Sequence, residues 1–225
     1  WIVGKTAEAA IDAARALEGY RFNDLASTLY QFAWGSFCDW HLEFAKPVFQ
    51  GDDAAAKAET RATTAWVLDQ LLHMLHPIMP FITEELAQAL SGDETTSLIE
   101  APWPDLDDSY IDNDAAVEMD WVVRLISQIR AVRSEMNVNP GAKIPMSLKD
   151  ADDTVATRLE THKGLICTLA RLESADLLDG DVPKGAVQDV IDEATFVLPL
   201  AGIIDVDSEA ARLEKEIARL EADIT

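Results

Sequence analysis

Two pairs of potential metal ligands stand in the first half of the chain, each with a spacing of three residues. Cys38 and His41 form one pair, and His73 and His76 form the other. Residues three apart share one face of a helix, so two such pairs on neighbouring helices could converge on Zn²⁺. However, His41 continues an aromatic stripe, and neither pair lies at the kind of turn that usually presents zinc ligands. We therefore predict polar packing or helix capping for these side chains, and no metal.

The chain shows no catalytic signature. It contains no GxSxG, no HExxH and no glycine-rich dinucleotide loop,. Gly4-Lys5-Thr6 matches only the end of a phosphate-binding loop, which also requires an earlier glycine and a preceding strand,. We therefore expect no catalytic residue and no cofactor in this chain.

Two groups of side chains are suited to RNA. Residues 30–43 are unusually aromatic, and flat rings can stack on unpaired bases, although most of these rings are expected in a helical core,. Trp40 lies off the main aromatic stripe, and Lys46 stands near the expected helix end. A basic cluster later in the chain could contact phosphates or could form a solvated face with carboxylate partners; its members are Arg124, Arg130, Arg133 and Lys143.

The charge of the chain argues against indiscriminate nucleic-acid binding. Forty-one acidic against 18 basic side chains give a net charge of -23, which repels a polyanion,. Taken alone, this charge points to a protein partner, but a local basic strip can still bind RNA. An acidic proteome or an adaptation for solubility is the explanation that we prefer. Two distant cysteines and the lack of an apolar run of roughly 20 residues predict a cytoplasmic protein that does not enter a membrane,.

Hydrophobic periodicity predicts a helical bundle over residues 1–140. Asn23 is expected to cap the second helix, Lys46-Pro47 to stop it, and Pro77 and Pro80 to form a corner between the third and fourth,. The inner stripe of the second helix is predicted to be Tyr30, Trp34, Phe37, His41 and Phe44,. The expected helices are 2–18, 23–44, 54–76, 80–90 and 114–136.

A small α+β subdomain is predicted for residues 141–205. Strands are expected at 144–148, 186–191 and 195–200, with one or two helices over 154–172,. From residue 206 to 225 the apolar spacing predicts the start of a C-terminal coiled-coil helix, whose seam consists of Ala210, Leu213, Ile217, Leu220 and Ile224,. The predicted fold class is thus mainly α, with a bundle, this subdomain and the coiled-coil start.

The corner segment 76–86, which reads HPIMPFITEEL, resembles the helical anticodon-binding domain of class I aminoacyl-tRNA synthetases for valine, isoleucine and leucine. Further segments resemble the valine enzymes in particular: 20–23, 37–43 with Lys46-Pro47, 129–137, and 198–205 followed by 213–216. The last of these resembles the passage into the coiled-coil arm of those enzymes. The resemblance covers essentially all 225 residues.

This resemblance implies a parent enzyme that joins valine to its tRNA. ATP and Mg²⁺ would be used in a catalytic domain, and threonine would be cleared in an editing domain, both upstream of Trp1. The HIGH and KMSKS signatures are absent, the chain lacks an initiator Met, and a helical pattern is already running at Trp1, so we expect a fragment. Its implied partners are the upstream catalytic domain and valine tRNA, contacted at the anticodon loop, with adenine in the middle of the anticodon, and at the outer corner.

Position and side-chain chemistry select candidate contacts within this framework. On the bundle they are Trp40, Lys46, Arg130 and Arg133, with Leu42 and Glu43 for packing or base edges,. On the arm they are Arg212, Lys215 and Arg219. The alternative function is an acidic helical module that docks a protein through the open seam from Leu213 to Ile224.

Overall fold

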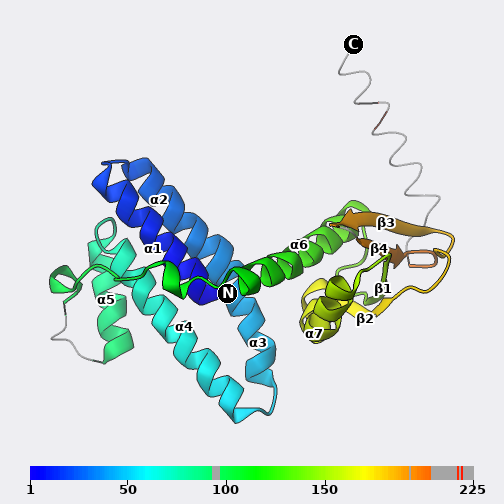
Figure 1. The fold of residues 1–225 in the computed structure, drawn as a ribbon, viewed down its shortest axis with the longest axis horizontal. Coiled ribbons are helices and arrows are strands. Elements are labelled where there is room, and N and C mark those ends of the chain that lie inside the picture. Colours follow the sequence, from blue (N-terminus) through cyan, green and yellow to red (C-terminus); the bar gives the residue numbers. More distant parts are fainter. Residues whose placement is uncertain (93–96, 193, 204–216, 218, 220–225) are drawn as a thin grey trace. The chain divides into compact units, whose positions relative to one another are not determined.

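The computed structural model describes residues 1–92, 97–192, 194–203, 217 and 219 (Figure 1). The chain forms two compact units, Trp1–Met119 and Asp120–Thr225. The division falls inside helix α6 (Asn113–Glu135), whereas the sequence predicted a division at residue 140. The part of α6 from Asp120 onward belongs to the second unit, and its arginine side chains are hydrogen-bonded there, as described below.

The first unit is helical, as predicted. Five α-helices and a π-helix make up most of it, and two 3-10 turns, Leu98–Glu100 and Asp108–Tyr110, follow. Asp53 caps α4 by accepting hydrogen bonds from the amides of Ala55 and Ala56,. The helices are α1 (Ile2–Glu18), α2 (Phe22–Tyr30), the π-helix (Gln31–His41), α3 (Leu42–Gln50), α4 (Ala54–Leu75) and α5 (Pro80–Ser91).

The second predicted helix differs from expectation at both ends. Asn23 does not cap it, because the helix begins one residue earlier and the Asn23 amide donates to the Asp24 carboxylate at 2.8 Å. Pro47 does not end it either, since α3 continues to Gln50. Proline removes one backbone hydrogen bond, but packing continues beyond it, with the Phe49 ring 5.9 Å from the Arg61 guanidinium carbon.

A π-helix interrupts this long helical run. Its backbone closes hydrogen bonds over five residues instead of four,. The buried positions accordingly pass from Leu29 and Phe32 to Phe37, a step of five, and then to His41. Phe37 and His41 are buried as predicted, whereas Tyr30 and Trp34 are 65% and 55% exposed. The predicted inner stripe was therefore wrong in its first half, because it assumed α-helical spacing throughout.

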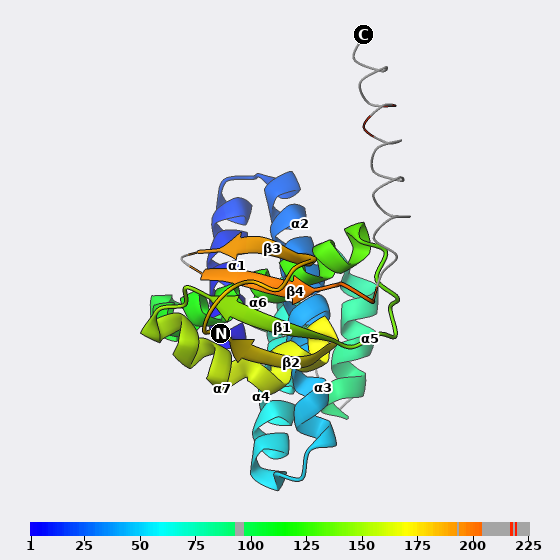
Figure 2. The ribbon, with the colours of Figure 1, turned by 90° about the vertical axis from the view of Figure 1, so that its right-hand side faces the viewer.

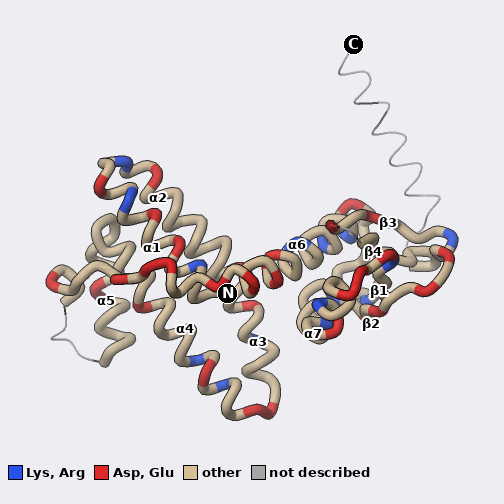
Figure 3. Tube along the Cα trace, in the orientation of Figure 1, with Lys and Arg blue, Asp and Glu red and all other residues tan. Residues whose placement is uncertain are grey.

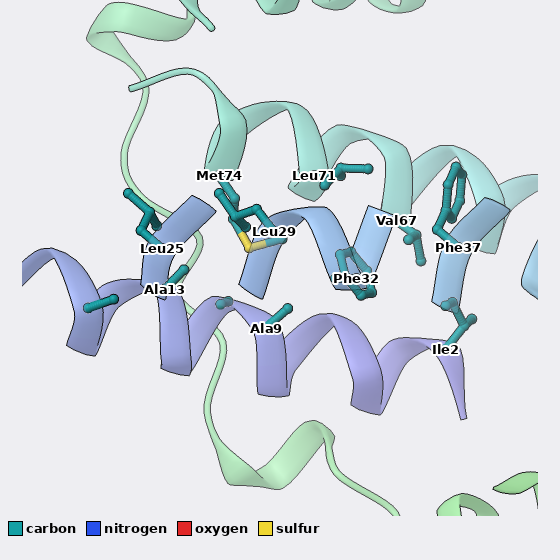
Figure 4. Packing of buried hydrophobic residues seen from close by; sticks show 12 residues of the cluster. Ile2, Ala9, Ala13, Leu25, Leu29, Phe32, Phe37, Val67, Leu71 and Met74 are labelled. Carbon is teal, nitrogen blue, oxygen red and sulfur yellow. The ribbon is translucent and has the colours of Figure 1, made fainter. Parts of the chain in front are cut away.

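The core of the first unit lies between α1, α2, the π-helix and α4 (Figure 4). The face of α1 consists of small residues, so larger side chains of the other helices can approach its backbone closely. Ala9 and Ala13 lie opposite Leu25, Leu29 and Phe32 in this way. The α4 side of the cluster is formed by Val67, Leu71 and Met74.

The predicted proline corner joins α4 to α5. Thr83 is 1% exposed, and its hydroxyl donates to the carbonyl of Met79 and is hydrogen-bonded to His76 Nδ1 at 2.8 Å. Glu84 accepts from the Leu98 amide at 3.0 Å, which fixes the following 3-10 turn against α5. The histidine, threonine and glutamate of this motif therefore hold the corner together.

The second unit contains a four-stranded sheet in the order β2-β1-β4-β3. Strands β1 and β2 are parallel and are connected through α7, and the other pairs are antiparallel. Helices α6 and α7 lie on one face of the sheet (Figure 2). The bounds are β1 (Ile144–Lys149), α7 (Asp153–Ala170), β2 (Leu172–Leu177), β3 (Ala186–Ile191) and β4 (Ala194–Pro199).

Strand β2 was not predicted. Only Leu172 and Ala175 are buried in it, and its two acidic residues obscure the alternation typical of strands,. In β1, by contrast, every second residue is buried, and in α6 the predicted apolar face is buried from Val122 to Val132. The mainly α fold with a small α+β subdomain is confirmed, while the predicted coiled-coil start lies outside the described residues except at Ile217 and Arg219.

We predict that Leu29→Ala lowers the free energy of unfolding of the first unit by about 3 kcal/mol, because it leaves a cavity in the core,. Urea unfolding followed by circular dichroism measures this loss. Tyr30→Ala removes a larger side chain from the neighbouring exposed position and should cost under about 1 kcal/mol,. Equal losses for the two variants would contradict the burial pattern at the start of the π-helix.

His41 provides a second prediction. It is 8% exposed and hydrogen-bonded to Thr64, and burial, followed by the charge of the N-terminus, lowers the pKa of His41 below its ordinary 6.5. His41 therefore binds a proton more readily in the unfolded chain than in the folded one. The free energy of unfolding should consequently fall as the pH drops through 6.5 toward the pKa of His41 in the folded state,. His41→Gln should lose this part of the pH dependence in urea unfolding, whereas His162→Gln on α7 should keep it. The same pH profile for His41→Gln and the unaltered protein would refute this role.

Candidate functional site

The first group of candidate residues lies where the π-helix passes into α3. The Trp40 ring is half-buried and lies 5.6 Å from the Phe44 ring, which in turn lies 5.7 Å from that of Trp1. Leu42 packs against the core cluster of the first unit. Trp40 therefore has neighbouring rings within the protein, and Leu42 contributes to positioning the helix.

Glu43 and Lys46 form an ion pair across one turn of α3. Lys46 keeps 60% of its side chain exposed, compared with 35% for Glu43. An exposed pair of this kind contributes little to stability. The Lys46 ammonium group can therefore leave the Glu43 carboxylate and bind a phosphate instead, with little loss of folding stability.

The structure reveals two exposed aromatic side chains that the sequence placed in the core. Tyr30 and Trp34 lie on the outside of the helix with their ring centroids 6.5 Å apart. Exposed neighbouring rings provide a surface on which unpaired bases can stack. The aromatic segment was recognised from sequence, but the five-residue step that turns these two rings outward was not visible there.

The basic cluster lies on and after α6 (Figure 3). Arg124 binds Asp192 through two hydrogen bonds of 2.8 and 2.9 Å, so its charge is paired. Arg130 is exposed and its Nε donates to the carbonyl of Leu169 at 3.1 Å. Arg133 is only 7% exposed and donates to the carbonyls of Arg171, Asn139 and Ala142.

The candidate residues of the arm are mostly beyond the described part of the chain. Arg219 is described and exposed. Arg212 and Lys215 lie outside the described residues. The structure thus brings together Trp40, Leu42, Glu43 and Lys46 on one helical segment, and Arg130 and Arg133 on another.

The potential zinc ligands have other partners. His41 is bonded to Thr64, His73 to the carbonyl of Asp69 at 2.9 Å, and His76 to Thr83. Cys38 is half-buried, and burial is the main cause of its raised pKa, with the Asp39 charge adding to it. Polar packing therefore accounts for the three histidines, whereas Cys38 packs against the hydrophobic core cluster. The described residues contain no cluster of three or more metal-binding side chains.

None of the described helices is both long and apolar enough to cross a membrane.

Residues 1–148 match the family model described as the anticodon-binding domain of tRNA ligase. This match covers the helices of the first unit, all of α6 and most of β1.

Curated relatives resemble the chain over almost its whole length. The valine–tRNA ligase of Caulobacter vibrioides is 47% identical over 221 residues, which is 97% of this chain and 24% of the relative. That of Rhizorhabdus wittichii is 47% identical over 98% of this chain and 24% of the relative, and that of Zymomonas mobilis is 46% identical over 100% and 26%. The chain spans about a quarter of the length of these proteins.

These matches favour tRNA recognition over the protein-docking alternative. The motif at the α4–α5 corner, on which the resemblance was first based, lies within the matched residues. The chain therefore belongs to the family of tRNA-ligase anticodon-binding domains, and the three curated relatives named above, which match almost its whole length, are valine–tRNA ligases.

Proposed function

We propose that this chain is the tRNA-recognition region of a valine–tRNA ligase and that it binds the anticodon loop of valine tRNA. The family match over residues 1–148 is the observation that carries the proposal. Attachment of valine, with ATP and Mg²⁺, would take place in the remaining three quarters of a polypeptide like those of the relatives. The chain itself holds and orients the RNA in the cytoplasm.

The helical run from Tyr30 to Lys46 offers the chemistry that an anticodon loop requires. Splayed bases need flat surfaces, and Tyr30 and Trp34 present exposed rings at 6.5 Å,. The phosphates need cations, and Lys46 is the exposed cation of this segment. Glu43 provides acceptors for the exocyclic amine of an adenine or cytosine, while Leu42 holds the helix in place,.

Phosphate contacts elsewhere complete the proposed interface. Arg130 is the exposed candidate on α6, and Arg133 acts as a positioning residue because it is buried and bonded to three carbonyls. On the arm, Arg212, Lys215 and Arg219 are proposed to contact the outer corner of the tRNA. The overall charge of -23 opposes binding of arbitrary RNA, so these local groups would also favour the correct ligand,.

The stacking surface can be tested with Trp34→Ala in the full-length ligase. Loss of one stacked base should weaken binding of valine tRNA about tenfold or more, since stacking contributes roughly 1–3 kcal/mol per base. Filter binding measures the dissociation constant, and Trp34→Phe should recover part of the affinity. Phe81→Ala is the control, because Phe81 is 91% exposed on α5, away from this helix in the chain.

The proposed recognition of the anticodon can be tested by changing the tRNA. Replacing the adenine in the middle of the anticodon should reduce both binding and the kcat/KM for charging by the full-length ligase. Trp34→Ala should diminish this discrimination if its ring contacts the loop. Equal binding and charging of the two tRNAs by the unaltered ligase would contradict anticodon recognition.

A further inference from the structure

One cavity of the second unit is lined by cationic side chains. It has a volume of about 420 Å³ and lies between the end of α6, the turn after it and the end of α7. Arg130, Arg133 and Arg171 line it together with the hydroxyl-bearing Ser134, and the other lining residues within the described part of the chain are uncharged. The chain has 41 acidic side chains, yet the described residues that line this cavity include three arginines and no carboxylate.

Arg133 forms the floor of this positive site. It is 7% exposed, and its guanidinium donates to carbonyls of Arg171, Asn139 and Ala142 at 3.3, 3.3 and 2.8 Å. These acceptors are neutral groups, so they fix the orientation of the guanidinium and leave its charge uncancelled. The pKa of Arg133 is lowered mainly by burial and secondly by the positive charge of Arg171.

Arg171 reaches the cavity from an unusual backbone position. It is the residue that ends α7, with φ 54° and ψ 53°, the left-handed conformation in which glycine is strongly favoured,. Its side chain donates to the carbonyl of Pro140, across the cavity wall. Glycine would suit this backbone conformation. What arginine adds at this position is its side chain, which lines the cavity.

Capping of helix ends explains part of the arrangement. Arg130 and Arg133 satisfy the carbonyls of Leu169 and Arg171 at the end of α7, where cations are favoured by the helix dipole,. Capping does not require a third guanidinium from the left-handed residue, nor a cavity between the three. Forked guanidinium donors converging on an open space are suited to a phosphate group.

We propose that this cavity binds a phosphodiester group of the bound tRNA, with Arg171 and Arg130 as direct contacts and Arg133 as the positioning residue beneath them. This inference rests on the proposed function. It adds Arg171 to the tRNA-binding residues and assigns the α+β unit a contact with the RNA backbone. The volume exceeds that of one phosphate, so part of the adjoining ribose can enter as well.

Arg171→Gly in the full-length ligase provides the central test. Glycine relieves the left-handed backbone, so the variant should keep its thermal unfolding temperature while losing the guanidinium,. We expect valine tRNA to bind about tenfold more weakly. The slope of the logarithm of affinity against the logarithm of salt concentration should become shallower by about 0.7–0.9, as for one lost phosphate contact.

Matched variants separate this site from general charge effects. Lys184→Gln removes one exposed cation of the same unit that does not line the cavity, and it should leave affinity and salt slope unchanged. Arg171→Lys keeps the charge without the fork and should give an intermediate affinity. The loss in Arg171→Gly should be the same for valine tRNA and its anticodon variant, because a phosphate contact does not read the base.

The outcomes distinguish the inference from the proposed function. Unchanged affinity and slope in Arg171→Gly, with weakened binding in Trp34→Ala, would overturn the phosphate site and leave anticodon recognition standing. Failure of the unaltered ligase to discriminate the anticodon variant would instead overturn the proposed function. Calorimetric binding of inorganic phosphate that Arg171→Gly abolishes, without any change in tRNA affinity, would assign the cavity to a free anion and refute the RNA contact.

Discussion

The first unit depends on a change in backbone hydrogen bonding between Gln31 and His41. In this segment the helix closes its bonds over five residues, and the buried side chains follow with a step of five between Phe32 and Phe37. That step keeps Leu25 and Leu29 before it, and His41 after it, directed at the same core. It also leaves Tyr30 and Trp34 exposed. A single backbone feature thus determines both how α1 and α4 are packed and which rings can meet a ligand.

The second unit contains a local group of arginines in a chain that is acidic as a whole. Arg124 is neutralised by Asp192, whereas Arg133 and Arg171 donate to backbone carbonyls. Carbonyl partners fix the direction of a guanidinium without removing its charge. The side chains of Arg133 and Arg171 therefore concentrate positive charge at the cavity between the ends of α6 and α7, in a chain whose net charge is -23,.

Much of this architecture could be predicted from residues alone. Proline positions located the α4–α5 corner, and apolar periodicity located α1, α4 and α6 within a few residues. Strand β2 escaped detection because an edge strand with few buried residues carries little pattern. The candidate site was harder to predict, because exposure of Trp34 and burial of Arg133 depend on backbone geometry and on carbonyl acceptors that a sequence does not display. Side-chain chemistry indicated the right segments, and tertiary contacts decided the role of each residue.

The five-residue step also affects how related chains can differ in length. Each residue of an α-helix is rotated by about 100° from the one before it, so an inserted residue normally turns everything downstream away from its packing partners. Between Leu29 and Phe37 the wider helical turn absorbs that rotation, and His41 and Ala45 still face inward. A homologue with one residue fewer, wound there as an ordinary α-helix, would keep the same interior. This stretch is therefore a place where evolution can add or delete a single codon while the downstream half of the helix retains its orientation.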